Sequence, residues 1–118
     1  MTGQMGHQVP IDVAAIERTC DIADGVAARA LAGQAIPTDE QVDALRDLLH
    51  GHLRLVAADV RVQYRDSGSM GLPGLVAAVL TLVEGLVDAP ERRGVLDLLA
   101  PPAAIRLLLT LWVTSVRR

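Results

Sequence analysis

The residues best suited to chemistry stand near the middle of the chain, where a single glycine separates His50 from His52. An imidazole can serve as an acid, a base or a metal ligand near neutral pH. Residues two apart on a strand could bind one metal ion, but the flanking apolar residues repeat with a helical period. On a helix these two side chains do not face each other, so they cannot chelate one metal. The sequence therefore predicts no metal site and no cofactor.

Four polar residues make up the candidate ligand-binding set: His52, Asp59, Tyr64 and Glu84. On a helix His52 and Asp59 lie two turns apart, roughly 10 Å along the axis, so they cannot bond to each other but could line one groove. Glu84 interrupts an apolar run, where it could act as an acid or base facing a pocket. For His52 and Asp59 we favour separate partners, a carbonyl or an arginine from another helix, because buried polar groups are normally paired. For Glu84 this means an exposed edge or a pair with an arginine.

Three acidic residues, Glu17, Asp21 and Asp24, are spaced to lie on one side of a helix. Such a group could hold a divalent cation or position an acid. Spaced acids on a surface helix are common, and we favour a solvated acidic face with Arg18 and Arg29 as nearby partners. The chain has no glycine-rich phosphate loop and no nucleophile elbow, so no catalytic residue is assigned. Whether the protein is an enzyme is left open.

The element that must position His52 and Asp59 is a helix predicted over residues 38–65. Thr38 and Gln41 form a capping box at its start. Its apolar face repeats at three- and four-residue steps through Val42, Leu45, Leu49, Leu53, Val56 and Val60. The outer face is predicted to be solvated and carries Asp39, Asp43, Arg46, Asp47, His50, Arg54 and Arg61. Gly51 costs the helix about 1 kcal/mol relative to alanine, which indicates close packing or a kink.

The fold class is predicted to be all-α, a small bundle of four main helices plus a short fifth helical segment. Beside the central helix, the expected elements cover residues 10–31, 75–87, a short segment at 88–100, and 102–116. Pro101-Pro102 is expected to separate the last two of these. Gly33 is expected to end the first helix, on which Cys20 is a buried thiol. Residues 1–9 are expected to form a flexible arm, and residues 10–118 a single domain.

The apolar content is high for so small a chain. The protein has 118 residues, of which 51% are hydrophobic, and its mean hydropathy is +0.34. A domain of this size leaves much of its surface exposed, so the excess points to a buried interface or an apolar cavity. We predict a homodimer through the helix at Leu75–Val87, the helix at Ile105–Val116, or both.

Charge and cysteine content argue against nucleic-acid binding, an intrachain disulfide and a multi-cysteine zinc site. The net charge is -3 and the isoelectric point is near 5.5, which argues against nucleic acid as a partner. Cys20 is the single cysteine, so an intrachain disulfide and a multi-cysteine zinc site are excluded. The first residues lack a basic-then-apolar signal sequence, and a cytoplasmic location is expected. The apolar helix at Leu75–Val87 is too short to cross a membrane, so no membrane span is predicted.

The stretch at 50–60 reads HGHLRLVAADV. It resembles a family of small helical proteins of unknown function, labelled natural-product biosynthesis proteins, from high-GC actinobacteria. That family's signature is similar to Arg-Gly-His-Leu/Ile-x-Leu-Leu-x-Pro-Glu-Val. His50 replaces its arginine, Ala58 its proline and Asp59 its glutamate, and the likeness covers about a quarter of the chain. The resemblance implies an accessory role in secondary metabolism and supplies no catalytic residue.

Two functions follow as hypotheses. The first is an accessory helical protein of natural-product biosynthesis that acts through protein–protein contacts as a homodimer, with a biosynthetic enzyme as a possible partner. The alternative is a small enzyme or binding protein for a hydrophobic metabolite, with a pocket near His52, Asp59, Tyr64 and Glu84. A transcription-associated module is a third option, which the negative charge disfavours. A solid core with an apolar outer face would favour the first, and an enclosed cavity at His52 the alternative.

Overall fold

The fold is all-α over the residues that the computed structural model describes, 11–67, 73–88 and 94–116. Its elements are α1 (Val13–Leu31), α2 (Asp39–Ser67), α3 (Pro73–Asp88), the short 3₁₀ helix η1 (Gly94–Leu98) and α4 (Ala100–Val116). These ranges contain no strand, so the all-α prediction is confirmed. The predicted arm at 1–9 and the predicted helix start near 89–91 lie outside the described residues.

Local capping fixes the connection between the first two helices. Gly33 has a φ of 73°, the left-handed conformation that glycine adopts most easily, directly after α1. The Gln34 N–H donates to the Arg29 carbonyl at 2.8 Å and the Gly33 N–H to the Ala30 carbonyl at 3.1 Å, which is a Schellman motif. The predicted capping box then starts α2: the N–H of Thr38 donates to the Gln41 side-chain oxygen at 2.9 Å, and the reciprocal bond is 3.1 Å.

The short segment before α4 differs from its prediction. Pro101 and Pro102 do not separate two helices, because both lie in the first turn of α4. Proline is tolerated there, since the N–H groups of a first turn have no partner inside the helix. η1 therefore leads through Leu99 straight into α4, and the fifth segment is an extension of the last helix rather than a separate element.

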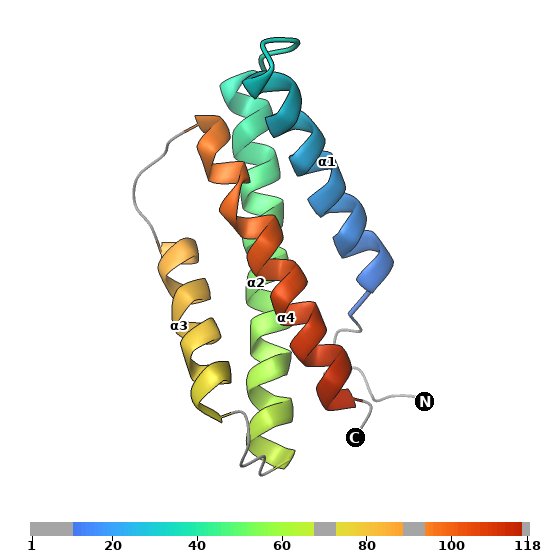
Figure 1. Ribbon diagram of the computed structural model, residues 1–118, viewed down its shortest axis with the longest axis vertical. Coiled ribbons are helices and arrows are strands. Elements are labelled where there is room, and N and C mark those ends of the chain that lie inside the picture. Colours follow the sequence, from blue (N-terminus) through green and yellow to red (C-terminus); the bar gives the residue numbers. More distant parts are fainter. Residues whose placement is uncertain (1–10, 68–72, 89–93, 117–118) are drawn as a thin grey trace.

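α2 is the central element, and α1, α3, η1 and α4 all contact it. Figure 1 shows α2 running the length of the molecule, with α4 crossing in front of it and α3 beside its lower half. Of the six residues predicted for its apolar face, five are buried and Leu45 is partly buried. Leu49, Leu53, Val56 and Val60 are each 0% exposed. The predicted phase of this helix is confirmed.

The predicted outer face of α2 is partly wrong. His50 is only 7% exposed, and the side chain of Arg46 is 11% exposed. The reason is η1, which packs on this side of α2 and covers residues that a two-faced helix would leave in water. Gly51 is exposed, and a Cβ placed there would meet no other atom within 4 Å, so close packing does not explain it.

One helical stretch has the length and composition of a membrane span. It runs from Gly94 to Thr114, 21 residues, and 44% of its most apolar 18-residue segment is buried inside the protein. Burial inside a protein is what the core helix of a globular domain also shows, so the stretch alone does not define a membrane helix.

Candidate functional site

His52 joins the two longest helices. Its Nε2 lies 3.3 Å from the hydroxyl oxygen of Thr19 on α1. The Thr19 hydroxyl donates its hydrogen to the Ala15 carbonyl at 3.2 Å, so Thr19 accepts and the His52 Nε2–H donates. Burial lowers the pKa of His52, which favours this neutral ring. The partner of His52 is therefore a threonine of another helix, and not the carbonyl or arginine that the sequence led us to expect.

Asp59 and Tyr64 both reach from α2 to the second half of α4. The Trp112 indole N–H donates to the Asp59 carboxylate. The Tyr64 hydroxyl donates to the Leu111 carbonyl at 3.0 Å, and Tyr64 is 8% exposed. Both residues thus form hydrogen bonds with buried or half-buried polar groups where α2 and α4 pack together. These bonds help to hold α4 against α2.

Glu84 lies at the surface of α3. The Arg61 guanidinium donates to its carboxylate at 3.3 Å, and the side chains are 50% exposed for Arg61 and 64% exposed for Glu84. This confirms the interpretation as an exposed edge paired with an arginine. Such a pair contributes little to stability, because water screens both charges. Glu84, Arg61 and Arg54 line a shallow depression of about 270 Å³ between α2 and α3.

The four predicted site residues do not converge on one point. Asp59 and Tyr64 share the contact with α4, His52 turns to α1, and Glu84 pairs with Arg61 in solvent. Each has its own partner within the protein. Separate partners were expected for His52 and Asp59, but these partners are Thr19 and Trp112 rather than a carbonyl or an arginine. Their role in binding a ligand stays a prediction.

The acidic face of α1 has a partner from the far end of the chain. The Arg106 guanidinium, on α4, lies 3.0 Å from Asp21 and 2.9 Å from Asp24. The expected partners Arg18 and Arg29 are not the ones that form these ion pairs. Among the described residues, no group of three or more acids, histidines or cysteines is placed to hold a metal. Two of the three acids therefore pair with α4, in ion pairs that water screens as it does the Arg61–Glu84 pair.

His50 belongs to a polar cluster that helical spacing did not reveal. It neighbours Arg46, whose Nε lies 3.6 Å from the carboxylate of Asp97 on η1. Burial lowers the pKa of His50, and the positive charges of Arg46 and Arg54 lower it further. Only the η1–α2 contact could have placed this histidine, and no local spacing signals that contact.

The two histidines should make stability fall in mild acid. Both histidines have a pKa in the folded protein below the ordinary 6.5. Below pH 6.5 the unfolded chain therefore binds more protons than the folded protein does, which favours unfolding. The contribution of the two neutral histidines to the free energy of unfolding is present in full above pH 6.5. It is lost as the pH falls through their lowered pKa values. The melting temperature of the His50→Gln, His52→Gln double variant should drop less than that of the wild type from about pH 8 to about pH 5. Parallel curves for the two proteins would contradict this.

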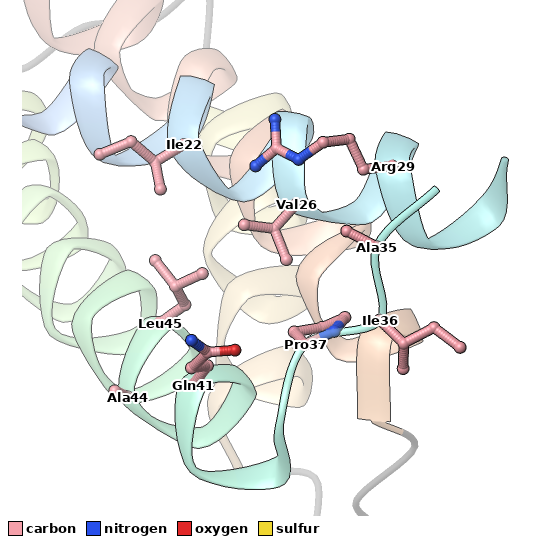
Figure 2. A pocket seen from close by; sticks show the side chains of 9 residues that line it. All are labelled: Ile22, Val26, Arg29, Ala35, Ile36, Pro37, Gln41, Ala44 and Leu45. Carbon is pink, nitrogen blue, oxygen red and sulfur yellow. The ribbon is translucent and has the colours of Figure 1, made fainter. Parts of the chain in front are cut away.

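A groove that the sequence did not predict lies where α1, the connection at 34–37 and the start of α2 meet (Figure 2). It has a volume of about 420 Å³ and contains none of the four predicted residues. Ile36, at its edge, is 83% exposed. The sequence offered one sign of this groove, which is the isoleucine beside Pro37. Connections between helices normally carry polar residues, so an isoleucine there indicates an apolar surface.

A scan against protein-family models finds no match for this chain, and searches of curated proteins and of solved structures find none either. The resemblance of the stretch around Gly51-His52 to natural-product biosynthesis proteins therefore stays a prediction. Its residues His52 and Asp59 have structural partners in this protein, Thr19 and Trp112.

Proposed function

We propose that this protein is a cytoplasmic, non-enzymatic interaction protein, a bundle of four main helices that acts as a homodimer through the outer faces of α3 and α4. The supporting observation is an uncharged stripe along α4. The exposed residues of α4 include Ala100, Ala103, Leu107, Thr110 and Thr114. These five residues are uncharged. The nearest charge is Arg106 at the edge of the stripe, whose side chain is 42% exposed and pairs with Asp21 and Asp24. An uncharged helix face of this length is unusual in water.

The threonine hydroxyls strengthen the case for burial of these faces. Thr110 and Thr114 donate to the carbonyls four residues earlier, at 3.0 Å and 2.8 Å, and Thr81 on α3 does the same at 2.9 Å. A hydroxyl with a satisfied donor can be covered by a partner helix without losing a hydrogen bond to water. On α3 the exposed residues include Ala78 and Leu82, so close helix approach is open to both faces.

The role that we propose for the dimer is accessory to natural-product biosynthesis, with a biosynthetic enzyme as a possible partner, no nucleic acid partner and no membrane span. The resemblance at 50–60 supports the pathway, and the net charge of -3 supports the exclusion of nucleic acid. The alternative, an enzyme or metabolite-binding protein with a pocket near His52 and Glu84, has less support because these side chains turn in different directions.

Sedimentation at micromolar concentration tests the homodimer. The wild type should sediment at about twice its chain mass of 12.5 kDa. Leu107→Arg should give monomers, because it puts a charge in the middle of the α4 stripe, where Leu107 is 43% exposed. The matched control is Leu48→Arg on α2, where the leucine is 50% exposed and outside the stripe, and it should stay dimeric. A wild type that sediments only as the 12.5 kDa species would refute the homodimer.

The pathway role is tested separately in the source strain. A strain that carries Leu107→Arg should lose the same metabolite as a deletion strain, while the Leu48→Arg strain should keep it. If the deletion strain has an unchanged metabolite profile, the assignment to biosynthesis is wrong whatever the oligomeric state.

A further inference from the structure

The groove between α1 and α2 has the make-up of a small-ligand site. Its volume of about 420 Å³ falls within the range of ligand pockets, about 300–1,000 Å³. Ile22 and Ile36 line the groove and are 55% and 83% exposed. Among the described residues, none covers these apolar walls, and they face solvent. Val26 and Leu45 form the inner wall, as Figure 2 shows.

Two polar side chains line this groove, and both offer hydrogen-bond donors. The Arg29 guanidinium forms no ion pair with any described residue. The Gln41 side-chain oxygen already accepts the Thr38 N–H in the capping box, so the free part of this amide is its NH₂ group. An apolar channel with a guanidinium and an amide NH₂ is complementary to a ligand that accepts hydrogen bonds and carries negative charge.

Gly25 allows the guanidinium of Arg29 to lie against α1. A Cβ at position 25 would come within 3.3 Å of the Arg29 Nη1, tighter than ordinary van der Waals contact. The Arg29 guanidinium therefore lies near Gly25 of the same helix, although Arg29 is exposed. An alanine at this position would shift the guanidinium by only a few tenths of an ångström, because the end of an arginine side chain is flexible.

We propose that this groove binds a small apolar molecule with a carboxylate, whose charge lies at Arg29 and whose apolar body lies along Val26 and Leu45. The connection at 34–37 closes one end of the groove, so a continuous helix or strand of a partner would have to pass through it. A single small molecule needs no open end. The site is independent of the homodimer, because none of its residues belongs to the outer faces of α3 and α4.

Titration with dodecanoate below its micelle concentration tests the proposal, with binding followed by backbone amide resonances of ¹⁵N-labelled full-length protein. The resonances of Val26, Ile36 and Leu45 should shift saturably. Dodecanol and dodecyltrimethylammonium, which have the same chain without the carboxylate, should bind about tenfold more weakly or not at all. Arg29→Gln should weaken dodecanoate binding about tenfold.

Arg18→Gln is the matched control, because it removes an exposed arginine of the same helix and leaves the groove intact. It should bind dodecanoate as the wild type does. The proposal is overturned if dodecanol binds as tightly as dodecanoate, or if Arg29→Gln and Arg18→Gln have equal effects. It is also overturned if the groove resonances respond to protein concentration and not to dodecanoate, since a second copy of the chain would then be the occupant.

Discussion

Val56→Asp should abolish cooperative unfolding, and the purified variant should lose its native circular dichroism signal at room temperature. Val56 is 0% exposed and belongs to the apolar core cluster around α2, so an added carboxylate would be placed among apolar side chains. Burying an unpaired charge costs several kcal/mol in a real protein, and the loss of valine packing adds to that. A domain with about 5–15 kcal/mol of total stability has little left after such a change.

Val62→Asp is the matched control for this prediction. It makes the same substitution on the same helix, at a valine that is 36% exposed, so the new carboxylate can stay hydrated. Its melting curve should stay cooperative, with a loss below about 1 kcal/mol. A soluble Val56→Asp protein that unfolds cooperatively like the control would show that the buried face of α2 is rotated from its position here.

The core of α2 could be predicted because its signal is local and repeated. Each of Leu49, Leu53, Val56 and Val60 lies three or four residues from the next, so the sequence alone defines which side is apolar. The capping residues Thr38 and Gly33 were predictable for a similar reason, since each acts on backbone groups within one turn.

The features that the sequence did not predict depend on contacts between segments far apart in the chain. His50 was assigned to a solvated face because nothing near it in sequence shows that η1 covers it. Arg106 could not be paired with Asp21 and Asp24 for the same reason, and the Thr19 partner of His52 requires the packing of α1 on α2. The groove at Arg29 depends on the path of a connection, which periodicity does not describe.

Leu49→Ala should lower the free energy of unfolding by about 2–5 kcal/mol. Leu49 is 0% exposed and belongs to the core cluster in which α1, α3 and α4 pack on α2, so its removal leaves a cavity. The size of the loss depends on how far the surrounding side chains can close that space. Chemical denaturation at one fixed protein concentration gives the value, because the stability of a dimer would change with concentration.

The adjacent residue provides the matched control, since Leu48 is 50% exposed while Leu49 is fully buried. Both substitutions remove the same atoms from the same helix, so helix propensity and side-chain chemistry cancel in the comparison. Leu48→Ala should cost less than about 1 kcal/mol, because its side chain remains largely in water when the protein folds. Equal losses for the two variants would mean that Leu48 is buried in solution, as it would be if a partner molecule covered this side of α2. A larger loss for Leu48→Ala than for Leu49→Ala would contradict the helix phase itself.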